Sequence, residues 1–372
     1  MIQLKPNAIF TMLLILMGSL LCSAQNRVEV NIPDIPGYRT LKCDFHMHTV
    51  FSDGDVWPTV RVQEAWLEGL DAIAITDHIE YLPHSQDLQS DHNRSFEIAE
   101  PLADQMGIVL IRGTEITRKM PPGHLNALFI KNANLLEREN WWDACVEARE
   151  QGAFIFWNHP GWKAQQPDTT RWWDEHTRLL NAGMLNGIEV YNYKEFYPEA
   201  LEWARQKKLT VMANSDMHSP ATMEYGTKHR PMTLVFATDK SQGAIKQALK
   251  DNRTVAYFDN QLVGDRQYLT PLFFGSIKIK NKKLELENHQ IQKVQIHNAS
   301  DIDFHLKLRQ PAIGLSCPEE ITLEAHRTVF IDLTGTSDEV KTMDRLKLLY
   351  EVTNLKTLSG NPLPVSIDIA NQ

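Results

Sequence analysis

Apolar and polar residues follow two alternating patterns between residues 39 and 260. Short and nearly continuous apolar runs, which are typical of buried strands, alternate with longer segments that have the apolar spacing of amphipathic helices. We expect strands at 41–48, 71–77, 108–116, 125–130, 154–157, 187–191, 209–214, 233–237 and 254–258, and helices at 59–69, 85–106, 141–151, 170–181, 198–208 and 242–250. This alternation predicts a parallel sheet with crossover helices, and about seven apolar strands favour a closed barrel.

The pattern changes near residue 262. Short segments with alternating apolar residues follow one another, turn residues separate them, and no long helical stripe is present. The expected strands are 276–280, 284–287, 294–297, 304–308, 321–324, 328–333 and 346–351. They predict a small all-β, immunoglobulin-like sandwich, although the Cys, Trp and Cys spacing of antibody domains is absent. We therefore predict an α/β barrel domain at 25–261 and a sandwich domain at 262–372.

The first 24 residues have the layout of a secretory signal peptide. Lys5 precedes an apolar run at 9–21, and Cys22-Ser23-Ala24 supplies small residues at the end of that run. The run is too short to span a bilayer, so no transmembrane anchor is expected. Leu21 stands where a lipoprotein signal needs a small residue, which favours cleavage after Ala24. We expect export to the periplasm or the extracellular space.

Composition and charge limit the functional classes. With 42% hydrophobic and 23% charged residues, a chain of 372 residues can bury a sizeable core. Removal of the signal peptide takes away Lys5 and changes the net charge from −9 to −10, which disfavours a general nucleic-acid-binding surface. Only Cys43, Cys145 and Cys317 then remain, so the protein has no even disulfide framework and depends on its core.

Two histidines at the end of the first expected strand are the first candidate metal ligands. Side chains alternate along a strand, so His46 and His48 share one face with Cα atoms roughly 6.6 Å apart. That spacing is close enough for both to hold one metal ion. Phe45 and Met47 then face the opposite, packed side.

Further histidines and carboxylates recur at the ends of the other strands. In barrels the carboxyl ends of the strands form one rim, and the chemistry is located there. The candidates at this rim are His46, His48, Asp53, Asp77, His78, Glu115, His124, His159, Asp216 and His218. Each has an ordinary explanation by itself, since Asp53 could form an Asx turn and Asp216 could cap a helix. Gathered together, such charged groups would repel one another or stay unsatisfied, so we predict that metal ions neutralise them.

These residues resemble the ligand motifs of the PHP (polymerase and histidinol phosphatase) family. The resemblance covers about residues 39 to 260, and the motifs occur in the family's order. They are His46-Met47-His48-Thr49, Ser52-Asp53-Gly54, Thr76-Asp77-His78, Gly113-Thr114-Glu115, His124, Asn158-His159-Pro160 and Ser215-Asp216-Met217-His218. The resemblance implies a distorted (β/α)7 barrel, two or three divalent metal ions and hydrolysis of phosphate esters.

The resemblance also implies how the ligands divide among the ions. The first ion would be held by His46, His48, Glu115 and Asp216, the second by Glu115 as a bridge with His124 and His159, and the third by Asp53, His78 and His218. Imidazole-rich, carboxylate-bridged sites of this kind suit Zn, Mn or Fe. Asp77 would orient a ligand histidine or a bound water.

The expected reaction is metal-dependent hydrolysis of a small phosphorylated substrate. A hydroxide that bridges the ions would attack the phosphorus of a phosphomonoester or phosphodiester in line. The expected catalytic residues are Glu115, Asp216, His159 and Asp77.

Candidate contacts to the substrate lie on the loops after several strands. Arg118 follows the third strand, Lys194 the sixth and Arg230 the seventh, where each could bind a phosphate. Tryptophans follow the fifth strand, where a ring could stack on a base or a sugar. They are Trp162, Trp172 and Trp173. The histidines interpreted as surface residues are His84, His92 and His176.

Two alternatives stay open at this point. Amidohydrolases also begin with two histidines on the first barrel strand, but they typically bridge their metals with a modified Lys on the fourth strand. Here Glu115 is the candidate bridge, and Lys is missing from the other strand ends. The second alternative is a noncatalytic protein that binds phosphorylated or sugar ligands through metal ions.

Overall fold

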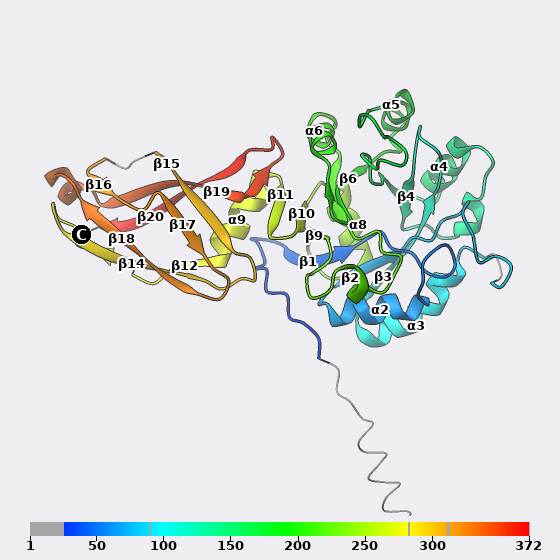
Figure 1. The fold of residues 1–372 in the computed structure, drawn as a ribbon, viewed down its shortest axis with the longest axis horizontal. Coiled ribbons are helices and arrows are strands. Elements are labelled where there is room, and N and C mark those ends of the chain that lie inside the picture. The colour runs from blue at the N-terminus through cyan, green and yellow to red at the C-terminus, as the bar shows by residue number, and fades with distance from the viewer. Residues whose placement is uncertain (1–25, 89–90, 282, 311–312, 372) are drawn as a thin grey trace, which may run out of the picture.

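The computed structural model describes residues 26–88, 91–281, 283–310 and 313–371. An α/β barrel and a β-sandwich follow one another along the chain (Figure 1). This arrangement confirms the predicted fold class. The predicted signal peptide at 1–24 lies outside the described residues, and no helix within them is long and apolar enough to cross a membrane.

Seven strands form the wall of the barrel. In pairing order they are β1 (Arg39–Asp44), β2 (Ala72–Ile75), β3 (Val109–Ile116), β4 (Leu125–Leu128), β5 (Phe154–Trp157), β6 (Gly187–Asn192) and β8 (Thr210–Asn214). All neighbours are parallel except β3 with β4 and β4 with β5. The prediction of an entirely parallel sheet is therefore wrong at β4. Residues 117–124 join β3 to β4 without a helix, and this connection is too short for a parallel crossover.

The barrel closes through the segments that follow its first and last strands. The amide of Asp216 donates to the carbonyl of His46 at 2.8 Å, and the amide of His48 donates to the carbonyl of Met217 at 2.9 Å. Along the edge of β1 that does not face β2, β9 (Met232–Ala237) pairs antiparallel, and β10 (Thr254–Phe258) continues antiparallel beside β9. Two segments that carry predicted ligands are thus hydrogen-bonded to each other.

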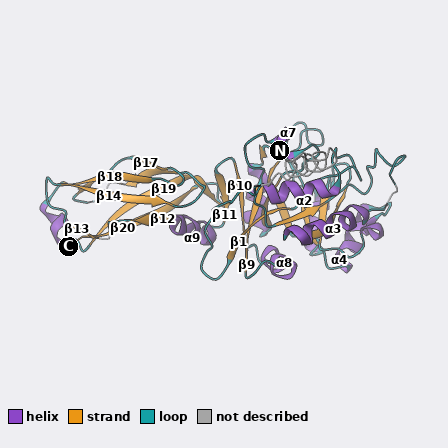
Figure 2. Cartoon of the chain, turned by 90° about the horizontal axis from the view of Figure 1, so that it is seen from below, coloured by secondary structure: helices purple, strands orange, loops and turns teal. Residues whose placement is uncertain are grey.

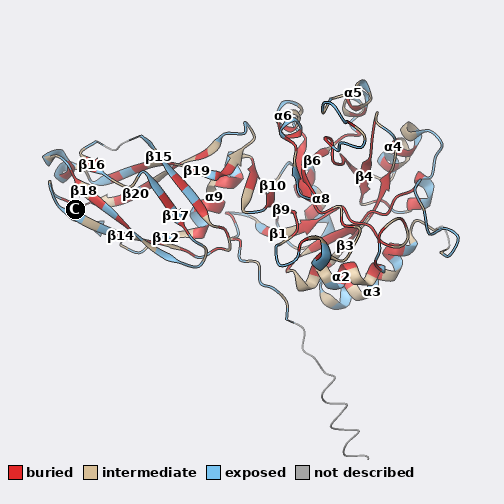
Figure 3. Ribbon diagram, in the orientation of Figure 1, coloured by how far each residue is buried: buried red, intermediate tan, exposed pale blue. Residues whose placement is uncertain are grey.

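Helices cover the outside of the barrel, with their buried sides toward the strands (Figure 3). They are α2 (Pro58–Leu67), α3 (Arg94–Met106), α4 (Trp141–Glu150), α5 (Asp174–Asn181), α6 (Pro198–Lys207), α7 (Ala221–Glu224) and α8 (Gln242–Lys250), with a 3-10 turn at Ala133–Leu136. The helix predicted at 85–106 begins only at Arg94. The side chain of Asp91 accepts the amide of Asn93 at 3.0 Å, and such a local turn competes with helix formation.

The C-terminal part is a sandwich of two sheets (Figure 2). One sheet contains β12 (Ile277–Ile279), β14 (Ile291–Asn298), β18 (Thr328–Gly335) and β16 (Leu315–Ser316). The other contains β13 (Lys283–Leu284), β20 (Pro362–Asn371), β19 (Arg345–Thr357), β15 (Phe304–Gln310) and β17 (Glu320–Leu323), and a 3-10 turn lies at Asp338–Thr342. Strand β20, in which Leu363, Val365 and Ile367 are buried at alternate positions, was missing from the predicted strands.

A hairpin and a helix join the two parts. Strand β11 (Gln261–Gly264) pairs antiparallel with β10 of the barrel and parallel with β19 of the sandwich, so one sheet runs through both. Helix α9 (Arg266–Ser276) follows, in a part of the chain where the sequence analysis found no long helical stripe and predicted strands alone. Asp265 caps this helix by accepting the amide of Gln267 at 2.8 Å. The internal Pro271 masked the helical pattern in the sequence.

His176, predicted at the surface, is fully buried in α5. Its ring stacks on Trp157 with centroids 3.6 Å apart, Nε2 lies 2.7 Å from the carbonyl of Pro122, and Nδ1 accepts the amide of Trp173 at 3.2 Å. Both ring nitrogens are used by the neutral imidazole. Burial lowers the pKa of His176 to about 4.

This burial predicts a pH-dependent stability. The unfolded chain takes up the His176 proton near the ordinary pKa of about 6.5, whereas the folded chain takes it up near 4, so stability is complete above pH 6.5 and falls between pH 6.5 and 4. The loss attributable to this residue is about 3 kcal/mol. Urea unfolding of metal-free wild type and His176→Gln at pH 7 and pH 4 measures it. Equal pH dependence in the two proteins would refute this role.

Candidate metal centre

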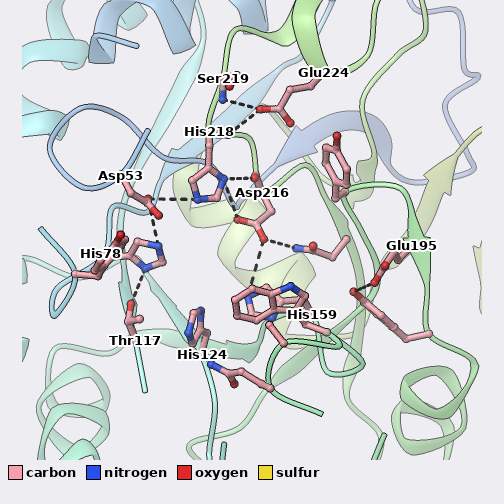
Figure 4. A pocket seen from close by; sticks show the side chains of 17 residues that line it. Asp53, His78, Thr117, His124, His159, Glu195, Asp216, His218, Ser219 and Glu224 are labelled. Carbon is pink, nitrogen blue, oxygen red and sulfur yellow. Dashed lines mark hydrogen bonds and ion pairs between the residues drawn. The ribbon is translucent and has the colours of Figure 1, made fainter. Parts of the chain in front are cut away.

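A cavity of about 790 Å³ opens at the carboxyl ends of the barrel strands (Figure 4). Predicted ligands from the loops after several different strands point into it, among them Asp53, His78, His124, His159 and Asp216. His218 faces the same cavity beside Asp53. The position agrees with the rule that catalytic side chains of such barrels lie at this rim.

His46 and His48 reach the site from just beyond β1, which ends at Asp44. Met47 forms an isolated parallel bridge with Met217, so the alternation of a strand continues past the end of β1. The two imidazoles therefore share one side, with ring centroids 5.2 Å apart, while Met47 is buried in the core. Both histidines are fully buried.

Among the residues that the structure describes, three groups of side chains have ligand atoms that lie within 4.8 Å of one another. They are His46, His48, Glu115 and Asp216; His78, Glu115 and His124; and His48, Asp53, His78 and His218. The first group has the membership that the family resemblance implied. The second contains His78 where the resemblance implied His159, and the third contains His48 in addition.

His159 lies beside these groups and in none of them. Its Nε2 is 3.9 Å from Oδ2 of Asp216, and its ring centroid is 4.9 Å from that of His124. His159 and Asp216 both have positive φ angles, 29° and 52°. A positive φ angle costs free energy in a non-glycine residue, so the surrounding structure must hold the residue in that conformation. Residues of this kind concentrate at functional sites.

Glu115 is the central residue of the site. It is the last residue but one of β3 and is fully buried. One carboxylate oxygen, Oε2, lies 2.8 Å from Nε2 of His46, and the other, Oε1, lies 3.2 Å from Nδ1 of His78 and also contacts His124. Each oxygen thus faces a different group of candidate ligands. A carboxylate in this position can bridge two metal ions.

The electrostatics of the site pair acids with imidazoles. Burial by itself would raise the pKa of Glu115, but His78 and His124 hold it well below its ordinary value. Burial would lower the pKa of His78, but Glu115 and Asp53 raise it to about 10. Burial lowers the pKa of His48 to about 3, and the neighbouring His78 and His218 contribute. Divalent ions held by the same atoms would take the place of the imidazole protons.

Glu189 in β6 is a part of the site that the sequence reasoning missed. It is fully buried, Oε1 lies 2.9 Å from Nδ1 of His46, and Oε2 accepts the amide of His159 at 2.7 Å. The side-chain amides of Asn192 and Asn214 donate to the same carboxylate at 2.8 and 2.9 Å. Glu189 therefore orients His46 and fixes the backbone of His159. A single acid in an otherwise apolar strand was the available signal.

Asp77 supports the site and does not line the cavity. Its carboxylate accepts the amide of Thr49 at 2.6 Å, the hydroxyl of Thr49 at 2.8 Å and the hydroxyl of Ser52 at 2.9 Å. The Ser52 hydroxyl is in turn 3.4 Å from Nδ1 of His48. Asp77 thus reaches a ligand histidine only through Ser52, which agrees with an orienting role but corrects its inclusion among the catalytic residues.

Two predicted phosphate contacts are wrong. Arg230 is fully buried, where its guanidinium binds Glu68 at 2.8 Å and Asp44 at 3.2 Å. Arg118 binds Glu80 at 2.7 Å and donates to the carbonyl of Glu139 at 3.0 Å. A sequence shows that a cation follows a strand but not which acid it meets in the fold. Lys194 is exposed beside the cavity, and its Nζ lies 3.1 Å from the hydroxyl of Tyr193.

The three tryptophans after β5 have different environments. Trp162 lines the cavity and is 41% exposed. Trp172 packs against Trp157 and Trp203, with centroids 5.9 and 5.6 Å away, and the Trp173 indole donates to Gln166 at 3.2 Å. Of this set, Trp162 has the position expected for stacking on a ligand.

Similar proteins agree with this geometry. Residues 277–368 match the DUF5001 family, which is described as an Ig-like domain. The chain is 45% identical to a two-domain protein from Bacteroides vulgatus that contains a predicted PHP-like metal-dependent phosphoesterase. That match covers 93% of this chain and 100% of the other, with a TM-score of 0.88.

Two curated relatives match over shorter segments. An uncharacterized protein from Methanocaldococcus jannaschii is 35% identical over 82 residues, which are 22% of this chain and 36% of that protein. A 5'-3' exoribonuclease from Haemophilus influenzae is 35% identical over 78 residues, or 21% and 24% of the two chains. The chain thus spans about a third and a quarter of the lengths of these relatives. With the ligand motifs gathered at one rim and the full-length match to the Bacteroides protein, the chain belongs to the PHP-like metal-dependent hydrolases, as a two-domain member with a C-terminal Ig-like domain.

Proposed function

We propose that this protein hydrolyses phosphate esters with two or three divalent ions, which its predicted ligands hold. The observation that carries the proposal is the position of Glu115, whose two oxygens face two different groups of histidines. The donor set is nitrogen and carboxylate oxygen without sulfur, which suits Zn, Mn or Fe. The phosphoesterase named in the full-length Bacteroides match supports the same substrate class.

The residues have separable tasks in this proposal. One ion would be held by His46, His48, Glu115 and Asp216. A second would be held by Glu115 and His124 with His78 or His159, and a third by Asp53 and His218. When bound, divalent ions would lower the pKa of water and offset the charge of phosphoryl oxygens. Glu189 keeps the His46 ring in place, so that this arrangement needs little reorganisation. Hydrolysis forms a bond from phosphorus to a water oxygen and breaks the bond to the ester oxygen, which leaves as an alcohol after taking a proton.

Removal of metal ions tests the proposal. We expect phosphate release from a panel of phosphomonoesters and phosphodiesters to fall to background after chelation and dialysis, and to return on addition of Mn²⁺ or Zn²⁺. Metal analysis of the purified protein and colorimetric phosphate detection measure both quantities. Undiminished release from metal-free protein would contradict the proposal. Ligand binding without turnover would favour the noncatalytic alternative.

Release of ammonia or a carboxylate without phosphate would favour an amidohydrolase. The fourth strand gives that alternative no support, because β4 consists of Leu125, Asn126, Ala127 and Leu128 and offers no Lys as a bridge. Export remains part of the proposal, and an exported enzyme would act on esters outside the cytosol. Fractionation of the producing cells tests this, since unprocessed chain in the cytosolic fraction would count against export.

A further inference from the structure

The outer wall of the cavity carries carboxylates in addition to those of the candidate ligands. Among the described residues that line it, none is Lys or Arg, whereas Glu195 and Glu224 add two carboxylates to those of the candidate ligands. Glu195 lies across the cavity from Asp53 and His78 (Figure 4), and its Oε2 accepts the hydroxyl of Tyr197 at 2.8 Å. Lys194 lies between Tyr193 and Glu195 in the chain but does not line the cavity, so a second anionic group of a substrate inside the cavity would meet these carboxylates.

Exposed aromatic side chains surround the same cavity. Tyr81, Trp162 and Tyr193 line it and are 53%, 41% and 38% exposed. Large aromatic side chains usually bury more of their surface, and their gathering at one concave site is typical of binding to a ring.

The aromatic rings are next to the candidate ligands. The Trp162 ring centroid lies 5.1 Å from that of His159 and 5.7 Å from that of His124, and the Tyr81 centroid lies 5.9 Å from that of His78. Backbone hydrogen bonds hold Trp162, because its amide donates to the carbonyl of His159 at 3.0 Å and its carbonyl accepts the amide of Gln166 at 2.9 Å. A ring joined through an ester oxygen to a phosphate at the metal ligands would therefore meet Trp162.

We propose that the cavity selects esters with a single phosphate whose other part is an uncharged ring, either a sugar or a nucleoside, that stacks on Trp162. Esters with a second phosphate are disfavoured by Glu195 and Glu224. This inference rests on the proposed phosphoesterase function and specifies its substrate. Aromatic platforms accept both kinds of ring, since each presents a flat or apolar face to the indole.

The test compares kcat/KM for four esters with metal-loaded protein: glycerol 2-phosphate, glucose 6-phosphate, adenosine 5'-monophosphate and glucose 1,6-bisphosphate. We expect at least one of the two ring-bearing monophosphates to exceed glycerol 2-phosphate by about tenfold, as one stacking contact provides. The preferred one distinguishes a sugar from a nucleoside. We expect glucose 1,6-bisphosphate to be a poorer substrate than glucose 6-phosphate.

Variants assign these preferences to residues. Trp162→Ala should bring the ratio of kcat/KM for the ring ester to kcat/KM for glycerol 2-phosphate close to one, and Trp162→Phe should retain most of the wild-type preference. Glu195→Lys should raise kcat/KM for the bisphosphate relative to the monophosphate severalfold. Phe274→Ala is the matched control, because Phe274 is also 41% exposed but lies on α9 and does not line the cavity. An unchanged ratio in Trp162→Ala, or a wild-type preference for glycerol 2-phosphate or the bisphosphate, overturns the inference while leaving the phosphoesterase intact. Failure to hydrolyse any ester overturns both.

Discussion

Replacement of Glu115 with Gln is expected to lower kcat/KM for phosphate esters by about a thousandfold or more. Metal ions contribute several kcal/mol to stabilisation of the transition state, and each 1.36 kcal/mol corresponds to a factor of ten. Oε2 of Glu115 lies 2.8 Å from Nε2 of His46, and Oε1 lies 3.2 Å from Nδ1 of His78. Gln has nearly the same shape but carries no charge and turns an NH₂ group toward one of these histidines, so it cannot bridge two ions.

The measurement combines steady-state kinetics with metal analysis. We expect Glu115→Gln to bind fewer ions than wild type while it keeps the circular dichroism spectrum of the folded protein. Glu150→Gln is the control, since Glu150 is an exposed glutamate at the end of α4 and should leave both quantities unchanged. Activity within a factor of ten of wild type in Glu115→Gln would show that the carboxylate is not a bridging ligand.

The ligand set was predictable because barrels gather the carboxyl ends of their strands at one rim. His46, Glu115 and Asp216 are distant in sequence, yet each lies at or just beyond the carboxyl end of a strand, and the fold brings them within contact distance. Their polarity also makes them conspicuous, since a charged group directly after a buried strand is costly without a partner. Strand ends, together with the PHP motifs, therefore predicted every member of the three groups of candidate ligands, whereas His159, also predicted as a ligand, belongs to none of them.

The supporting residues were not predictable in the same way. Glu189 lies within a strand, and its partners His46 and Asn214 are known only once the strands are ordered around the barrel. Arg230 follows the pattern of a substrate contact, but tertiary structure places it in a buried ion pair with Asp44. Helix α9 and the antiparallel direction of β4 were not predicted. Pro271 interrupts the helical pattern of α9, and the hydrophobic pattern of a strand is the same in either direction.

Arg61, another residue that the sequence did not single out, holds together the seam where the barrel closes. It lies on α2, is fully buried and donates to the carbonyls of His48 at 2.9 Å, Met217 at 3.1 Å and His218 at 2.7 Å. It also binds the carboxylate of Glu64 at 2.8 Å. One guanidinium thus satisfies backbone oxygens on both segments that carry metal ligands at the seam.

Arg61→Ala is therefore expected to lower the free energy of unfolding by about 3–5 kcal/mol, because it takes the donor from the buried carbonyl of His48, one of two donors from the carbonyls of Met217 and His218, and the paired charge from Glu64. Arg61→Lys should recover only part of the loss, since an ammonium cannot reproduce the planar fork of donors. The control is Arg94→Ala, which breaks an exposed ion pair with Glu97 and should cost under about 1 kcal/mol. Urea unfolding of metal-free protein gives these values. Calorimetric titration with Mn²⁺ should show affinity reduced about 10- to 100-fold in Arg61→Ala, because the segments that carry His48 and His218 lose the side chain that links them and keep only their backbone hydrogen bonds. A loss no larger than that of the Arg94 control, with unchanged Mn²⁺ affinity, would mean that the hydrogen bonds between the two segments close the barrel without Arg61.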